Sequence, residues 1–357
     1  MITTGSATTL KEAWMNFRES NPKTRIRDAA MSLGVSEAEL LATDCGGTVI
    51  RLEAPAQQPG WGSIIAKCAT LGRVMALTRN EHCVHERKGE FREIGFFGMM
   101  GNVLGPDIDL RFFLNHWRFG FAVRESANGE IHRSLQFFDA DGSAVHKIYL
   151  QPESNHSAFD EIVSEFTSRD QSGSLVTETV HASQPERPDA EIDVENFRAG
   201  WRALKDTHEF YGLLKRFDVG RTQALRLAGG DFARQLSPLC AEPLLRKAAE
   251  SKMPIMVFVG NPGMIQIHTG LVERIVPFGD GNEWINVLDS DFNLHLRQNA
   301  ITEAWAVQKP TRDGYVTSVE LFDAKNDLVV QFFGKRKPGN PELSEWRQLV
   351  STLESNL

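Results

Sequence analysis

The chain reads Phe138-Asp139-Ala140 and, 184 residues later, Phe322-Asp323-Ala324. These triplets belong to a longer match, in which Ile108–Tyr149 aligns without a gap with Phe292–Phe333. Nine aligned positions are identical, whereas roughly two or three would be expected by chance at average composition. The match therefore indicates that the chain contains two related segments.

Two flanking blocks repeat in the same order and at nearly the same spacing. Asn80–Gly89 matches Asn261–Gly270, and the region at Val35 matches the region at Val219. Ordered blocks with a period this long indicate an internal duplication and not a solenoid of short repeats. We therefore expect two homologous halves.

Each half shows helical spacing first and short strands afterwards. Apolar residues recur at helical spacing near the start of each half, in 9–17, 23–33, 194–204 and 208–216. Short β-branched or aromatic runs, broken by Gly, Asn and Asp, follow, as in 47–52, 73–78, 84–87, 119–124 and 134–138 and again in 255–260, 264–268, 304–308, 316–322 and 328–333. The two Phe-Asp-Ala triplets open turns that join consecutive strands.

This order predicts an α+β fold, a tandem duplication in which each half is a large antiparallel β-sheet with helices packed on it. Residues 168–193 are rich in Ser, Thr, Glu, Pro and Asp without a sustained apolar period, which is typical of a linker. We expect an N-terminal repeat at 1–170, a linker at 171–192 and a C-terminal repeat at 193–357.

Composition and charge narrow the class of protein. A net charge of −8 argues against a general nucleic-acid binder, which would be basic. The first residues lack the pattern of a secretion signal, and no apolar run is long enough to cross a bilayer, so we expect a cytoplasmic protein without a membrane span. The four cysteines form no metal-binding or disulfide pattern and are expected to be reduced.

Common catalytic motifs are absent from the sequence. It contains no dinucleotide-binding fingerprint, no phosphate-binding loop and no nucleophile elbow. His82 and His85 form an HxxH pair but lack the HExxH spacing of zinc peptidases, so the motif gives little support for a zinc site there.

His208 has the most informative surroundings of the ten histidines. It lies at a predicted helix start, with Asp206 or Thr207 as the cap, and Phe210 and Tyr211 follow it. Basic residues follow in the next turns, namely Lys215, Arg216 and Arg221. An imidazole, aromatic rings and cations together suit a flat, apolar, dianionic ligand such as haem. The alternative is an ordinary helix-start histidine beside a packed aromatic face.

A set of short sequence motifs extends over nearly the whole chain. They include Thr78-Arg-Asn-Glu, Asp107-Ile-Asp-Leu-Arg-Phe-Phe, Ser134-Leu-Gln-Phe-Phe-Asp, Val145-His-Lys-Ile-Tyr, Asp206-Thr-His, Gly260-Asn-Pro-Gly-Met-Ile-Gln-Ile-His, Ala304-Trp-Ala-Val-Gln-Lys-Pro-Thr and Gln331-Phe-Phe-Gly-Lys-Arg. Taken together, the motifs resemble the HemS/ChuS/ShuS/PhuS family of haemin-degrading and haemin transport (HmuS) proteins. The resemblance implies a duplicated α+β fold and haem as ligand.

The resemblance also implies roles for particular residues. His208 matches the axial ligand of the haem iron, Arg111 matches the distal arginine, and Phe113 matches a residue on the haem face. Residues near the propionates are matched by Arg221, Lys309, Gln331 and Arg336. A tyrosine that some relatives place just before that glutamine is Val330 here, so one polar propionate contact is missing or supplied elsewhere. Neither repeat carries the whole set, because Arg111 lies in the N-terminal repeat.

Each assignment has a structural alternative. Arg111 could pair only with Asp107 or Asp109, and Phe113 could be ordinary core. Lys309 and Arg336 could be solvated loop charges.

The implied function has two forms. In the first, Arg111 stabilises negative charge on an oxygen ligand while the ring is opened and iron is released, with electrons from an external donor. In the second, the protein is a non-catalytic carrier that delivers haem to a separate haem oxygenase. A third reading, in which the fold binds no haem, also remains. The sequence does not separate these readings, nor does it give the oligomeric state.

Overall fold

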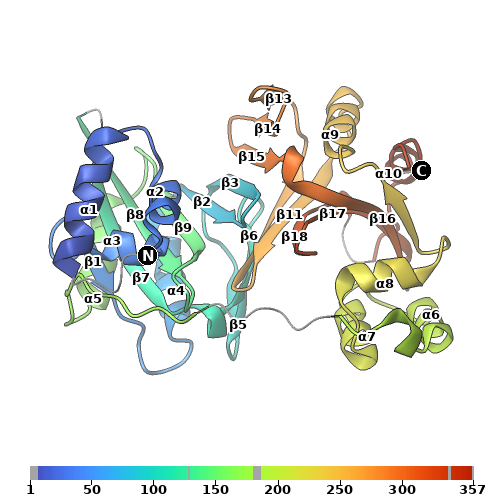
Figure 1. Ribbon diagram of the computed structural model, residues 1–357, viewed down its shortest axis with the longest axis horizontal. Helices are drawn as coiled ribbons and strands as arrows, with labels where there is room; N and C mark the ends of the chain where they lie inside the picture. The colour runs from blue at the N-terminus through green and yellow to red at the C-terminus, as the bar shows by residue number, and fades with distance from the viewer. Residues whose placement is uncertain (1–6, 128, 180–185, 337–338, 356–357) are drawn as a thin grey trace. The chain divides into compact units, whose positions relative to one another are not determined.

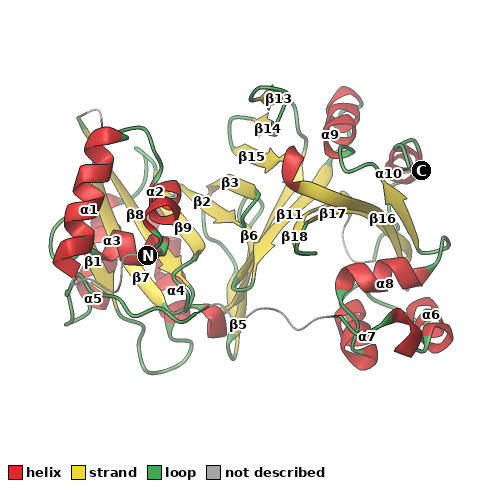
Figure 2. Ribbon diagram, viewed as in Figure 1, coloured by secondary structure: helices red, strands yellow, loops and turns green. Residues whose placement is uncertain are grey.

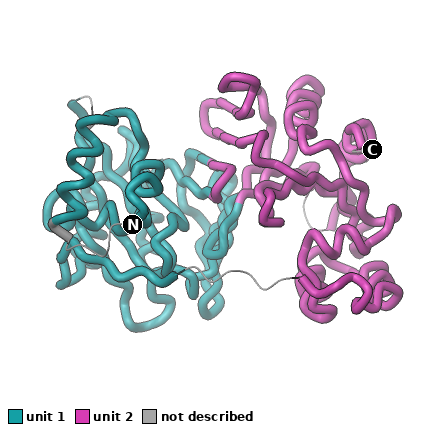
Figure 3. Tube along the Cα trace, in the orientation of Figure 1, with its two compact units in different colours: residues 1–79, 86–181, 260–266 teal, residues 80–85, 182–259, 267–357 magenta. Residues whose placement is uncertain are grey.

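The computed structural model describes residues 7–127, 129–179, 186–336 and 339–355. The chain divides into two compact units, shown in Figure 3. Unit 1 comprises residues 1–79, 86–181 and 260–266, and unit 2 comprises residues 80–85, 182–259 and 267–357. Each unit therefore contains a short segment from the other half of the sequence, which the division predicted from composition did not include.

The first half of the chain contains five helices and nine strands within its described residues (Figure 1). The helices are α1 (Ala7–Ser20), α2 (Ile26–Leu33), α3 (Glu37–Ala42), α4 (Trp61–Lys67) and α5 (His156–Phe166). The strands are β1 (Val49–Leu52), β2 (Val74–Arg79), β3 (Cys83–Gly89), β4 (Ile94–Phe97), β5 (Met100–Leu104), β6 (Asp109–Phe113), β7 (Phe119–Ala127), β8 (Glu130–Phe138) and β9 (Ala144–Leu150).

The second half repeats this order of elements (Figure 2). The helices are α6 (Val194–Arg202), α7 (Glu209–Phe217), α8 (Arg221–Ala228), α9 (Ala241–Glu250) and α10 (Ser344–Ser351). The strands are β10 (Ala233–Leu236), β11 (Ile255–Asn261), β12 (Met264–Gly270), β13 (Ile275–Phe278), β14 (Trp284–Leu288), β15 (Phe292–Arg297), β16 (Ile301–Thr311), β17 (Gly314–Asp323) and β18 (Leu328–Gly334). No helix in the described part of the chain is long and apolar enough to cross a membrane.

The strands form two nine-stranded sheets of matching topology. One has the order β1-β7-β8-β9-β2-β3-β15-β14-β13, and the other has the order β10-β16-β17-β18-β11-β12-β6-β5-β4. The predicted α+β fold with two large antiparallel sheets and a duplication is thus confirmed. The repeat did not show that each sheet takes three strands from the other half of the sequence.

In unit 1, helices cover both faces of the sheet. Successive side chains on a strand point to opposite faces, so neighbouring residues of β7 pack against different helices. Phe121 and Val123 on β7 pack with residues of α3 in one apolar cluster. Ala122, between them, belongs to a second cluster that includes residues of α4 and α5. Two-sided burial explains why β7 has apolar residues on both of its faces.

Unit 2 has the same two-sided arrangement. On β16, Trp305 and Val307 pack in a cluster with residues of α6, α7 and α8. Ala304 and Ala306 face a second cluster that contains residues of α9 and α10. The helix α6 begins after Asp193, whose side chain accepts a hydrogen bond from the Asn196 backbone N–H.

The short segment at 260–266 completes the core of unit 1. Met264 is fully buried in the α4 and α5 cluster. The Asn261 side chain donates to the carbonyls of Arg79 and Val145, each at 2.9 Å. The indole of Trp117 donates to the carbonyl of Gly263 at 2.9 Å. These hydrogen bonds give partners to three carbonyl groups that are buried or partly buried.

The duplicated segment at 80–85 has the same function in unit 2. Cys83 is buried in the α9 and α10 cluster. The Asn80 amide donates to the carbonyl of Val329 at 2.7 Å, and its oxygen accepts from the backbone N–H groups of His82 and Cys83. Asn80 and Asn261 occupy matching positions in the duplication, so both turns use the same side-chain chemistry.

The predicted linker lies against both units where it is described. The Gln171 side chain accepts from the backbone N–H of Arg51 at 2.9 Å in unit 1. In unit 2, Glu186 pairs with Arg226 at 2.7 Å. Residues 180–185 of the predicted linker lie outside the described residues.

Replacing Asn261 by Ala removes two donated bonds and one accepted bond at a turn that unit 1 needs. Because partly buried carbonyls lose a hydrogen-bond donor, we expect the free energy of unfolding to fall by about 1–3 kcal/mol. Urea unfolding followed by circular dichroism measures this loss. Asn21→Ala, which removes one exposed bond, is the control and should cost clearly less; equal costs would contradict the role of the turn.

Candidate functional site

His208 lies in unit 2 just before α7, and its side chain is 93% exposed. Its Nδ1 lies 2.6 Å from Asp206 Oδ1, which also accepts from the His208 backbone N–H at 2.8 Å. The other ring nitrogen, Nε2, has no hydrogen-bond partner among the described residues. A carboxylate on one ring nitrogen that leaves the other open is the arrangement that orients a histidine toward a metal.

The Asp206 side chain that contacts this ring is a carboxylate with a lowered pKa. The hydrogen bond from the His208 backbone N–H, followed by weaker effects of the ring and of Arg336, lowers the pKa of Asp206 below its ordinary value. Asp206 is therefore ionised near neutral pH. The predicted helix cap is wrong: α7 begins at Glu209, its N-cap is His208, and no side-chain cap bond is made. Asp206 instead accepts from the His208 backbone N–H in the preceding turn.

Three of the residues matched to propionate contacts meet in unit 2 around one carboxylate, Glu320 on β17. Arg221 donates to both Glu320 oxygens, at 2.7 and 2.9 Å. Lys309 Nζ lies 2.8 Å from Oε1, and the Ser318 hydroxyl donates to the same oxygen at 2.8 Å. Gln331 is directly opposite Glu320 in the β17–β18 register. We call Arg221, Lys309 and Glu320 the β17 charge cluster.

Burial makes this cluster electrostatically strong. Glu320 is fully buried, and Lys309 is 5% exposed. Burial alone would raise the pKa of Glu320, but the charges of Arg221 and Lys309 outweigh it and hold the pKa well below its ordinary value. Burial lowers the pKa of Lys309, and Glu320 opposes that shift. The cluster contains two basic side chains and one carboxylate, so its net charge is +1 when all three groups are ionised.

The aligned positions in unit 1 hold a different charge set. Position 37, which aligns with Arg221, is Glu37, and it forms a buried ion pair with Lys147. Position 136, which aligns with Glu320, is Gln136, and its amide donates to Ser134 at 3.0 Å. Position 125, which aligns with Lys309, is Glu125, and its negative charge also acts on Lys147. At these aligned positions, carboxylates outnumber cations in unit 1, whereas cations outnumber carboxylates in unit 2.

Arg336 and the aromatic residues near His208 have separate environments. Arg336 lies 3.8 Å from Asp313 and is 17% exposed. Phe210 is buried against Trp201, with ring centroids 4.7 Å apart, whereas Tyr211 is 65% exposed. Phe210 is therefore core beneath the β17 charge cluster, with Lys309 Nζ 4.6 Å from its centroid.

Arg111 and Phe113 lie on β6, in unit 1. Arg111 donates to the Asp109 carboxylate and to the carbonyl of Leu110, so the pairing with Asp109 anticipated as an alternative is present. Asp107 pairs with Arg87 instead, at 2.8 Å. Phe113 is half-buried, and its backbone N–H donates to Gly263.

One alternative from the sequence is corrected, and the HxxH pair gains no support as a joint site. Lys309 is not a solvated loop charge, because it lies on β16 and pairs with a buried carboxylate. His82 and His85 do not form a joint site: His85 is fully buried against Phe292, with ring centroids 5.0 Å apart, and His82 lies 3.4 Å from Asp323.

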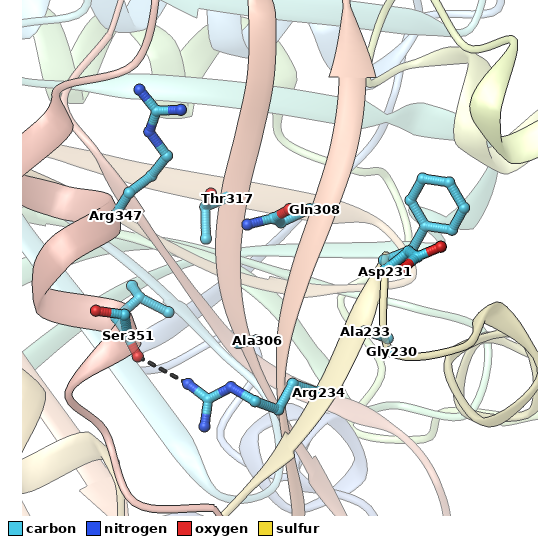
Figure 4. A pocket seen from close by; sticks show the side chains of 11 residues that line it. Gly230, Asp231, Ala233, Arg234, Ala306, Gln308, Thr317, Arg347 and Ser351 are labelled. Atoms are coloured by element: carbon cyan, nitrogen blue, oxygen red, sulfur yellow. Dashed lines mark hydrogen bonds between the residues drawn. The ribbon is translucent and has the colours of Figure 1, made fainter.

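A small cavity of about 160 Å³ lies elsewhere in unit 2, among residues of β10, β16 and α10 (Figure 4). Arg234, Gln308 and Arg347 contribute to its lining. It is smaller than the roughly 300–1,000 Å³ typical of ligand pockets, and none of the predicted site residues lines it.

Comparison with known proteins places the chain in a family. The model of the haemin-degrading HemS.ChuX domain matches residues 34–166 and 218–353. The chain belongs to the HemS/ChuX family. The two matched segments correspond to the two halves of the duplication, and the resemblance identified from the sequence is confirmed.

Relatives align over nearly the whole chain. The hemin transport protein HmuS of Yersinia pestis is 37% identical over 347 residues, covering 96% of this chain and 97% of the relative. The structure of holo-PhuS, a heme-binding protein from Pseudomonas aeruginosa, is 46% identical, with a TM-score of 0.93 and coverage of 98% and 100%. ChuS from Escherichia coli O157:H7, described as a heme degrading enzyme, is 33% identical, with a TM-score of 0.88 and coverage of 98% and 99%.

Glu320 was missed by the sequence reasoning, although a signal was present. It stands between Val319 and Leu321 in a strand that is buried on both faces. A carboxylate at such a position requires cationic partners, and basic residues precede it on β16 and at the start of α8.

Glu320→Gln leaves Arg221 and Lys309 without their shared carboxylate. We expect a loss of about 3–5 kcal/mol at pH 7, because a charge is left buried and unpaired. The pKa of Glu320 is lower in the folded state than its ordinary value of 4.5. Its contribution to stability is therefore complete above pH 4.5 and is lost as the pH falls toward the folded-state pKa. Guanidinium unfolding between pH 3 and 7 should show that acid-dependent component in the wild type and not in Glu320→Gln.

The control for this measurement is the double variant Glu320→Gln/Lys309→Met. It retains only Arg221, which is 28% exposed and can be hydrated. We expect it to be more stable than Glu320→Gln alone. If the loss in the double variant equals the sum of the losses in Glu320→Gln and Lys309→Met, the two residues are not coupled and the interpretation is contradicted.

Proposed function

We propose that this protein binds haem in the bacterial cytoplasm through His208 and degrades it, opening the ring and releasing iron. The observation that supports haem binding most directly is the exposed His208 imidazole, held at Nδ1 by Asp206 with Nε2 open. The holo-PhuS relative, at 46% identity over nearly all of this chain, is a heme-binding protein.

The residues of this chain would act in distinct ways. Asp206, held ionised by the hydrogen bond from the backbone, accepts from Nδ1 of His208 and orients the ring, so that Nε2 is the nitrogen that would bind the iron. The surplus cation of the β17 charge cluster offers one charge-assisted contact to a propionate. Arg221 is the member of that cluster available for it, since Lys309 is enclosed. Gln331 and Arg336 add polar contacts on the same unit.

Arg111 and Phe113 are the proposed contributors from the N-terminal repeat. An arginine keeps its charge at any physiological pH and can stabilise negative charge on an oxygen ligand. Haem supplies the iron that activates oxygen. Electrons would come from an external donor, because the sequence lacks a nucleotide-binding fingerprint.

Non-catalytic haem transport to a separate haem oxygenase is the second candidate. The relatives named for transport and heme binding support it, at 37% and 46% identity, whereas the ChuS relative described as a heme degrading enzyme supports degradation. Both functions need His208 and the β17 charge cluster, and they differ in whether the ring opens.

His208→Ala is expected to lower the affinity for haemin by more than about tenfold, since even outer-shell partners of a metal ligand are worth about 10- to 100-fold. Its Soret band should shift as well, because the axial ligand is lost. Haemin titration followed by absorption measures both effects. His132→Ala, at an exposed strand position, is the control, and an unchanged spectrum in His208→Ala would point to another ligand such as Tyr211.

A time course separates the two candidates. The haem complex is given an electron donor in the presence of catalase, which removes free peroxide that destroys haem without turnover. We expect loss of the Soret band with formation of a linear tetrapyrrole and release of iron. A Soret band that persists, together with haem transfer to an added haem oxygenase, would favour the carrier and refute degradation.

A further inference from the structure

Three potential metal ligands converge in unit 2, away from the β17 charge cluster and His208. Glu81 and His82 lie in the turn between β2 and β3, and Asp323 ends β17. One carboxylate oxygen of each acid and one His82 nitrogen lie within 4.8 Å of one another. We propose that Glu81, His82 and Asp323 form a binding site for a divalent transition-metal ion such as Zn²⁺.

The spacing of the two inner ligands fits tetrahedral coordination. His82 Nε2 and Asp323 Oδ2 are 3.4 Å apart. Metal–ligand bonds of about 2.0–2.2 Å at a tetrahedral angle put neighbouring ligand atoms about 3.3–3.6 Å apart. A metal ion can therefore enter between these two atoms without a shift of the backbone.

Both inner ligands are held in place before any metal binds. Asp323 is 5% exposed, and its Oδ1 accepts from the backbone N–H groups of Lys325 and Asp327, which leaves Oδ2 directed at His82. The His82 backbone is held by the Asn80 side chain and by the Arg297 N–H. Such preorganisation lowers the cost of binding.

The charges around the site favour a cation. Glu81 and Asp323 bring two carboxylates to the site, and Asp327, whose backbone N–H donates to Asp323, adds a third nearby. Lys325 offsets one of these negative charges.

Glu81 supplies the third ligand from the exposed side of the site. Its carboxylate pairs with Lys325 at 2.9 Å, and both side chains are more than half exposed. An exposed ion pair of this kind contributes only about 0–1 kcal/mol, so a metal ion can displace Lys325. One imidazole and two carboxylates suit Zn²⁺ or another first-row ion better than Ca²⁺ or Mg²⁺, which prefer oxygen ligands alone.

The duplication provides an internal comparison. Position 139 in unit 1, which aligns with Asp323, is also aspartate, but the position that matches His82 is Gly263. Unit 1 therefore lacks the imidazole. The cysteines Cys83 and Cys240 of unit 2 are buried in the α9 and α10 cluster.

The test is calorimetric titration of the full-length, haem-free protein with ZnCl₂ at pH 7.5. We expect one bound Zn²⁺ in the wild type and binding more than about tenfold weaker in His82→Gln/Asp323→Asn, since even outer-shell partners are worth about 10- to 100-fold. Asp139→Asn is the matched control and should bind like the wild type. The Asp323→Asn substitution is expected to keep the turn, because an amide oxygen still accepts the two backbone bonds.

A second variant keeps the test valid where the double variant fails to fold. Lys325→Met removes the competing cation at an exposed position, so it should bind Zn²⁺ more tightly than the wild type and show a larger Zn²⁺-induced rise in Tm. No Zn²⁺ uptake by the folded wild type, equal isotherms for the wild type and the double variant, or unchanged affinity in Lys325→Met would each overturn the proposal. None of these readouts involves haem.

Discussion

Each compact unit depends on a short segment from the other half of the sequence. Unit 1 buries Met264 in its main apolar cluster and uses the Asn261 side chain to satisfy two carbonyls. Unit 2 buries Cys83 and uses Asn80 in the same way. An apolar core with such a segment removed would contain a void and several unpaired polar groups. The two copies of the ancestral module are therefore interdependent and cannot be treated as separate domains.

The duplication conserved positions while the charges on them diverged. In unit 1, Glu37 pairs with Lys147 in the interior, and Glu125 stands at the position of Lys309. In unit 2, Glu320 holds both Arg221 and Lys309, and one positive charge remains. A buried charge is tolerated only when it is compensated, and an anionic ligand is one form of compensation. The same backbone frame thus holds different buried charges in the two copies.

The sequence predicted the fold class, the duplication and most elements because these follow from local periodicity and turn residues. One example is the helix predicted at 194–204, where a capping aspartate precedes apolar residues at helical spacing. Another is the hairpin after Phe322, where turn residues separate two apolar strands. Membership of the family followed from ordered motifs. The exchange of 80–85 and 260–266 could not be predicted, because no local sequence pattern indicates in which unit a segment will pack.

The candidate site was predictable only in part for a similar reason. The sequence singled out His208, but Lys309 could equally have been a loop charge, since its environment is set by strand pairing that places it beside Glu320. His82 lost its apparent HxxH partner because His85 packs against Phe292, while Asp323, distant in sequence, came close. Distances across strands depend on tertiary structure, which spacing along the chain does not encode.

The exchanged segments also constrain how the protein is made in the cell. A ribosome synthesises about 5–20 residues per second, and domains usually fold in the order in which they emerge. Residues 1–181 emerge first, yet Gly263 and Met264 arrive much later and are needed to close their core. The nascent N-terminal half therefore remains incompletely packed until residues 260–266 have left the exit tunnel. Unit 2 is completed later still, when the residues up to α10 have followed.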